Sequence, residues 1–150
     1  MDARRQEGVM LIEALIGILI FSIGILALIG MQGTAVKNTT DARFRSEASY
    51  LANTITSQMR LDMANIDSYR DGSPGNYEPR TRWRLQVEAA LPGIDVAGNQ
   101  RVPTIDLQPG PTFAGDPSPS QRATVTVFWL QPGETQQRQF QVVTYVSAAN

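Results

Sequence analysis

The chain has 150 residues, with 13 basic and 14 acidic side chains and a formal net charge of −1. This near balance gives no broad electrostatic reason to expect nucleic-acid binding. Cysteine and histidine are both absent, which excludes disulfides, Cys/His metal clusters, Ser-His-Asp triads and Cys-His pairs. There is no Gly-rich phosphate loop either. The sequence therefore predicts no cofactor, no metal and no enzymatic function.

An uncharged run of 23 residues extends over residues 14–36. As an α-helix it would be about 34 Å long, which exceeds the roughly 30 Å of a bilayer's hydrocarbon core. A secretory signal peptide has a shorter apolar core that ends in a small-residue cleavage site, and no such site ends this run. Arg4 and Arg5 precede the run and little positive charge directly follows it. We therefore expect a single-pass anchor with a cytoplasmic N-terminus.

Glu13 stands directly before this run, and Gly8 lies five residues before Glu13. An ionised carboxylate in hydrocarbon costs several kcal/mol or more, so it persists there only with a partner or a function. In a generic anchor, Glu13 would instead be an interfacial residue without a special role. The position of this carboxylate favours an anchor that also has a function.

No proline interrupts the chain between Val9 and Ser73, and the residues become polar from Lys37 onward. Apolar residues then recur at spacings of three and four, which is typical of one face of a helix. We expect one continuous helix of roughly 60 residues, apolar all round at first and amphipathic later. The apolar stripe of its second half, which we expect to pack against a folded domain, consists of Ala48, Leu51, Ala52, Ile55, Met59, Met63 and Ile66.

The sequence Asp-Gly-Ser-Pro-Gly-Asn at residues 71–76 ends the helical region by its turn chemistry. Three carboxylates near this end are interpreted as ordinary solvated charges: Asp62, Asp67 and Asp71. Residues 81–91 fit either one face of a short helix or an alternating strand. The Leu-Pro-Gly sequence that closes this segment favours the helix.

Residues 102–107 are expected to form a strand, and residues 109–119 form a Pro/Gly/Ser-rich loop. Residues 124–129 alternate in the manner of a half-buried strand, and residues 140–146 are a second β-rich run. The Pro-Gly pair between the two runs predicts a turn, so we expect an antiparallel pair covered by the apolar stripe of the helix. These elements predict an α+β fold in which one long N-terminal helix packs on a small antiparallel sheet.

Gly8, Glu13 and the apolar helix that follows closely resemble the type III signal of type IV prepilins and pseudopilins. In that family a short basic leader ends in Gly, and an N-methylated Phe usually follows it. The resemblance implies that residues 1–8 are a leader, that the cut falls between Gly8 and Val9, and that Val9 is methylated in place of Phe. It also implies that Glu13 forms an ion pair with the N-terminal amine of a neighbouring subunit, and so sets the axial register between helices during assembly.

Residues 22–32 resemble the anchor of the PilV-type minor pilins, also called pilus modification proteins. Gln58-Met59-Arg60, Trp83 with the later Leu91-Pro92-Gly93, and the strand 125–129 appear in the order found in that family. The resemblance covers most of the chain, with its specific motifs in the N-terminal third. It implies a pilin-like fold.

The resemblance also implies a domain organisation and a location. Residues 1–8 would be the leader, residues 9–36 the transmembrane half of the long helix, and residues 37–150 a periplasmic pilin-like domain that includes the amphipathic half. The chain is expected in the bacterial inner membrane as a single-pass protein with a cytoplasmic N-terminus and a periplasmic C-terminal domain. From there it would be incorporated into the surface pilus.

The function that the resemblance implies is that of a minor pilin in the tip complex that primes type IV pilus assembly, and so supports twitching motility and adhesion. Its expected partners are other minor pilins, the major pilin, a prepilin peptidase/methyltransferase, the pilus assembly platform and a tip adhesin. A type II secretion minor pseudopilin has the same signal and is the main alternative. Another is a membrane-tethered adhesive module that binds through the 109–119 loop and exposed aromatics, although Trp129 and Tyr145 are expected to pack in the core or at its rim.

Overall fold

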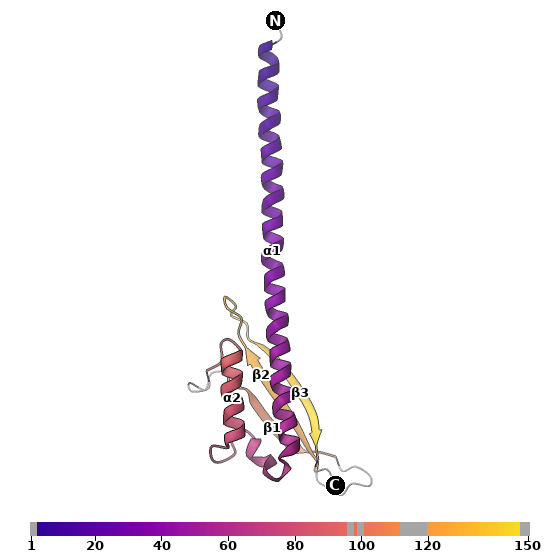
Figure 1. Ribbon diagram of the computed structural model, residues 1–150, viewed down its shortest axis with the longest axis vertical. Helices are drawn as coiled ribbons and strands as arrows, with labels where there is room; N and C mark the ends of the chain where they lie inside the picture. Colours follow the sequence, from indigo (N-terminus) through magenta and orange to yellow (C-terminus); the bar gives the residue numbers. More distant parts are fainter. Residues whose placement is uncertain (1–2, 96–97, 99–100, 112–119, 148–150) are drawn as a thin grey trace. The chain divides into compact units, whose positions relative to one another are not determined.

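The computed structural model describes residues 3–95, 98, 101–111 and 120–147, with residues 3–8 described by their main chain only. The chain divides into two units, Met1–Thr40 and Asp41–Asn150, which are described in turn. A single α-helix, α1 (Ala3–Leu61), contributes to both units (Figure 1).

In the first unit, residues 14–36 of α1 are uncharged and mostly apolar on every side, and the side chains of residues 9–39 are exposed. The hydroxyl groups in this part bond back to their own helix: Ser22 Oγ donates to the Ile18 carbonyl at 2.7 Å, and Thr39 Oγ1 to the Ala35 carbonyl at 2.9 Å. Such bonds satisfy a hydroxyl group without any partner from outside the helix. By length and composition, α1 contains one stretch able to cross a membrane.

The second unit contains a three-stranded antiparallel sheet in the order β1-β2-β3. Its strands are β1 (Thr104–Pro109), β2 (Gln121–Trp129) and β3 (Arg138–Val146). Val125 in the central strand lies opposite Ile105 of β1 and Val142 of β3. Because side chains alternate along a strand, these apolar residues share one face of the sheet.

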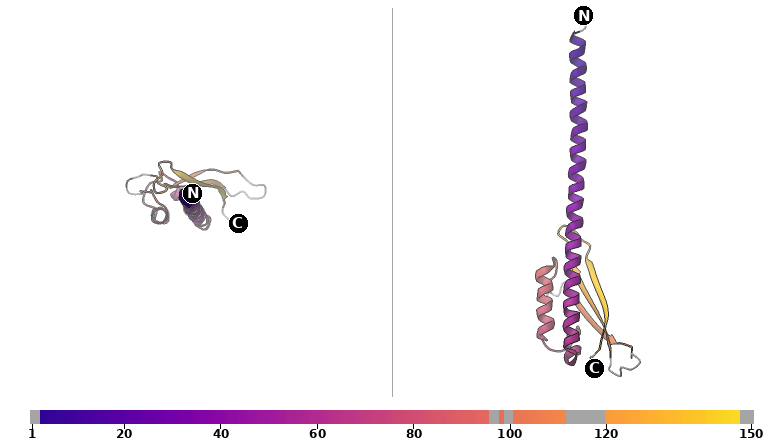
Figure 2. Two further views of the ribbon diagram at one scale, coloured as in Figure 1. Left: turned by 90° about the horizontal axis from the view of Figure 1, so that it is seen from above. Right: turned by 45° about the vertical axis from the view of Figure 1, so that its right-hand side comes forward.

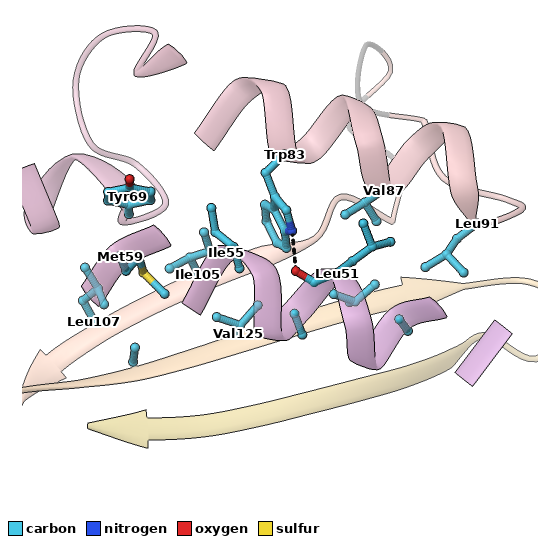
Figure 3. Close-up of a cluster of buried hydrophobic side chains, with 14 of the residues drawn as sticks. Leu51, Ile55, Met59, Tyr69, Trp83, Val87, Leu91, Ile105, Leu107 and Val125 are labelled. Atoms are coloured by element: carbon cyan, nitrogen blue, oxygen red, sulfur yellow. Dashed lines mark hydrogen bonds between the residues drawn. The ribbon is translucent and has the colours of Figure 1, made fainter. Parts of the chain in front are cut away.

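The C-terminal part of α1 and the shorter helix α2 (Glu78–Ala90) cover that face (Figures 1 and 2). Trp83 of α2 is 2% exposed and its indole N–H donates to the Leu51 carbonyl of α1 at 2.9 Å (Figure 3). Both helices therefore belong to one core, whose largest fully buried side chains include Trp83, Trp129, Tyr69, Ile55, Met59, Ile105 and Leu107.

The predicted α+β arrangement, with a long N-terminal helix packed on a small antiparallel sheet, is confirmed. The short helix after residue 77, the strand near residue 104 and the two C-terminal strands are all present. Pro109 belongs to β1 rather than to a loop. Residues 112–119 of the predicted 109–119 loop lie outside the described residues.

The long helix has the expected length, but the predicted apolar stripe continues beyond its end. The helix begins at Ala3 and stops at Leu61, and the 3₁₀ helix η1 (Met63–Tyr69) follows it. Asp62 breaks the α-helix because its φ/ψ of −125°/47° is non-helical, and its carboxylate accepts hydrogen bonds from residues that follow it. Local side-chain hydrogen bonds of this kind compete with helix continuation. Met63 and Ile66 still contact the core, but from η1.

The interpretation of Asp62 and Asp71 as solvated charges is also wrong. Asp62 accepts hydrogen bonds from the hydroxyl groups of Tyr69 and Tyr77. Asp71 pairs with Arg84, and its other carboxylate oxygen accepts the Ile105 N–H at 2.8 Å. The two carboxylates therefore tie η1 and the turn after it to α2 and the sheet. Asp67 does remain exposed, near Arg70 at 3.5 Å.

Candidate functional site: a carboxylate on an exposed apolar helix

The candidate site is the surface of α1 around Glu13, in the first unit. One helical turn advances by about 5.4 Å, and residues four apart lie on the same face. Val9 and Gly17 are therefore the neighbours of Glu13 one turn before it and one turn after it. The Glu13 side chain is exposed, as are its apolar neighbours Val9, Ile12 and Ile16, which are 51% to 66% exposed.

Among the described side chains, no ion pair engages Glu13. It is the only charged residue from Val9 to Val36, and the next one along the chain is Lys37. Over 24 residues at 1.5 Å each, Lys37 lies about 36 Å away along the helix axis, far beyond the reach of a salt bridge. If lipid surrounds this part of α1, the positive charge that compensates Glu13 has to come from the segment before Val9, which contains Arg4 and Arg5, or from another molecule.

The bond between Gly8 and Val9 lies inside α1, which starts at Ala3. A protease binds its substrate in an extended conformation, so this turn of helix has to open before the bond is cut. Glycine is the natural weak point, because it destabilises a helix interior by about 1 kcal/mol relative to alanine. Cleavage after Gly8 and methylation of Val9 stay predictions.

The second unit offers polar hollows but no cluster of metal-ligating groups among the residues that the structure describes. One hollow is lined by Asp41, Arg45, Trp129 and Arg138, together with glutamines of the β2–β3 connection. Two of its charges pair with each other, since Arg138 lies 2.7 Å from Asp41, and Arg138 also lies 3.2 Å from Glu134. Trp129 is 2% exposed, as predicted for a core residue, whereas Tyr145 is 48% exposed on the other face of the sheet.

The cluster of Asp62, Tyr69 and Tyr77 was not predicted. Hydrogen bonds, first from Tyr77 and then from Asn65, hold the pKa of Asp62 below its usual value. The same bond to Asp62 raises the pKa of Tyr77, while burial is the main cause that raises the pKa of Tyr69. The Asp-x-x-Asn spacing of Asp62 and Asn65 was the available sequence signal, because such pairs favour turns over helix.

Comparison of this chain with models of known protein families, with curated proteins and with solved structures finds no match. The residues themselves therefore carry the functional inference. They show a helix segment able to span a membrane, one carboxylate at its start that has no ion pair among the described side chains, and a small α+β unit with its own core.

Proposed function

We propose that this chain is a minor pilin that takes part in priming type IV pilus assembly. In this role a prepilin peptidase/methyltransferase removes residues 1–8 and methylates Val9, and the mature chain waits in the inner membrane with its C-terminal unit in the periplasm. It then joins other minor pilins, the major pilin and a tip adhesin on the assembly platform. Through them it supports twitching motility and adhesion.

The observation that carries the proposal is that Glu13 lies on an exposed apolar helix and has no ion pair among the described side chains. A generic anchor gains nothing from a carboxylate at this position, because lipid penalises the charge. A filament subunit does gain, since the N-terminal amine of a neighbour compensates the charge only when the two helices are correctly staggered. An ion pair in a low-dielectric environment is lost at a cost of several kcal/mol when one partner is removed. Glu13 would thus fix the axial register between neighbouring subunits.

The second unit is consistent with this proposal because its fold does not depend on the membrane-spanning segment. Its core closes around α1, α2 and the sheet without help from residues 9–36. Such a unit keeps its fold both in the membrane-anchored pool and in a filament. Residues 9–36 can then leave the lipid and pack against the helices of neighbouring subunits.

Deletion of the gene tests this function against its two alternatives. A minor pilin predicts few surface pili and loss of twitching, both restored by the wild-type chain. A type II secretion pseudopilin predicts normal twitching and a loss of exoprotein secretion. For a tethered adhesive module, the deletion strain keeps its pilus number, and replacing residues 109–119 abolishes adhesion.

A further inference from the structure

A hollow of about 300 Å³ lies in the second unit, between α1 and the adjoining ends of β2 and β3. Two of its residues are one turn apart on α1, since positions four apart share a helix face. Two others lie opposite each other in the sheet, where β2 ends and β3 begins. We call it the Arg45 hollow, and it is lined by Asp41, Arg45, Trp129, Gln136, Gln137, Arg138 and Gln139.

The charged groups of the Arg45 hollow are not equally engaged. The Asp41 carboxylate accepts the side-chain amide of Gln131 at 2.8 Å and lies 2.7 Å from Arg138. Arg138 also lies 3.2 Å from Glu134. The carboxylate one turn before Arg45 is therefore already occupied. Within the described part of the chain, the Arg45 guanidinium has no hydrogen bond and no ion pair.

A second lining residue, Trp129, carries an unused hydrogen-bond donor. Its side chain is 2% exposed, and its buried indole Nε1 has no acceptor among the described residues. The other tryptophan, Trp83, donates its indole N–H to the Leu51 carbonyl. A buried N–H without an acceptor is costly. An acceptor oxygen that a ligand brings to the Arg45 hollow would therefore be stabilised there.

These unused donors select an anionic oxygen ligand of low charge. Arg45 offers a positive charge and a fork of N–H groups, Trp129 offers one N–H, and the glutamine amides add further donors. A dianion is disfavoured, because Asp41 and Glu134 both engage Arg138 and their negative charges would repel it. A singly charged phosphodiester meets both conditions.

The place of the hollow along the chain favours a phosphodiester over other singly charged anions. Asp41 and Arg45 follow the uncharged run of residues 14–36 by five and nine residues, which is about 8 Å and about 14 Å of helix. If that run spans a bilayer, lipid headgroups occupy roughly the first 5–8 Å beyond the hydrocarbon core. Helical side chains lean toward the N-terminus of their helix, so Arg45 extends toward these headgroups.

We propose that the Arg45 hollow binds the phosphodiester group of a phospholipid headgroup. Arg45 pairs with a phosphate oxygen, and the Trp129 N–H donates to an acceptor oxygen of the same headgroup. This contact would hold the second unit at the membrane surface. The inference goes beyond the proposed function: it requires residues 14–36 to lie in a membrane, but it does not require a pilus.

The test uses the full chain in maltoside micelles, with ¹⁵N-labelled tryptophan and a short-chain phosphatidylglycerol as the probe. The chain has two tryptophans, so its indole N–H spectrum has two resonances, which Trp129→Phe assigns. The Trp129 resonance should shift as lipid is added, whereas the Trp83 resonance, already bonded to Leu51, should stay in place and report an intact core. The matching diacylglycerol, which lacks phosphate, should shift neither. Inorganic phosphate and acetate, at matched ionic strength, should bind at least about tenfold more weakly.

Two matched substitutions separate this site from a general attraction to anionic lipid. Arg45→Gln removes the unpaired charge and should weaken lipid binding at least about tenfold. Arg43→Gln makes the same change of charge at an exposed α1 position outside the hollow and should bind like the wild type. The proposal would be overturned by an unmoved Trp129 resonance, by equal binding of the two variants, or by equal shifts with diacylglycerol, acetate or inorganic phosphate.

Discussion

The two halves of α1 use helix surface in opposite ways. From Val9 to Thr39 the side chains are exposed although most are apolar, whereas the Ala48–Met59 stripe is buried within the second unit. Apolar surface of the first kind is stable only in lipid or against other helices. The comparison indicates that the core of residues 41–150 stabilises the second unit, whereas residues 9–36 contribute a stretch that is long and apolar enough to cross a membrane.

The largest expected effect is on processing and leaves the fold of the second unit untouched. Gly8→Val should abolish removal of the leader, since a side chain at the cut crowds the protease, whereas glycine permits a close approach of the backbone. Full-length chain should accumulate in the inner membrane. Mass spectrometry that finds Val9 at the N-terminus of this variant would show that Gly8 is dispensable.

A substitution in the core of the second unit should destabilise that unit and leave cleavage after Gly8 unchanged. Met59 is fully buried between α1 and the sheet, so Met59→Asp should lower the free energy of unfolding by several kcal/mol. The melting temperature of a soluble fragment that begins at Thr34 measures this effect. Tyr50→Asp, at a position of the same helix that is 66% exposed, is the control and should melt near the wild type. An unchanged melting temperature for Met59→Asp would refute the packing of helix on sheet.

The comparison of the two halves of α1 also shows which features could be predicted from the sequence alone. The stripe from Ala48 to Met59 was predictable because helical periodicity and a missing proline are local signals. The end of α1 was harder to predict, since the Asp62–Asn65 pair is a weak local signal and the hydrogen bond from Tyr77, fifteen residues away, is invisible to pattern rules. Gly8 and Glu13 of the candidate site were visible from their spacing, whereas the cluster of Asp62, Tyr69 and Tyr77 depends on contacts that only the fold creates.

A smaller effect tests the bond that joins α2 to α1. Trp83→Phe keeps an aromatic ring in the core but removes the indole N–H that bonds the Leu51 carbonyl. The free energy of unfolding should fall by about 1–3 kcal/mol, because the carbonyl loses its buried partner and a small void remains. Chemical denaturation of the Thr34 fragment measures it. Leu85→Ala, on the exposed side of α2, should change stability by less than half as much.

The smallest effect concerns pH. Because its hydrogen bonds lower the pKa of Asp62 in the folded state below 3.8, the stability it contributes is complete above that value and is lost as the pH falls through the folded-state pKa. Tyr77→Phe removes the main cause of the shift. The melting temperatures of wild type and variant should therefore differ at pH 7 and converge near pH 2. A difference that stays constant over this range would mean that the Asp62 charge is not involved.

The most direct measurement is the distribution of a Glu13→Ala variant between membranes and sheared pili, followed by immunoblotting. The variant should still be processed, because cleavage depends mainly on Gly8, and its second unit should still fold. It should remain in the membrane, since removal of the charge relieves its cost in lipid. Ser22→Ala is the matched control, because the Ser22 hydroxyl bonds only its own helix. The account predicts processed Glu13→Ala stranded in the membrane with fewer pili, beside normal Ser22→Ala; normal incorporation of Glu13→Ala and normal piliation would contradict it.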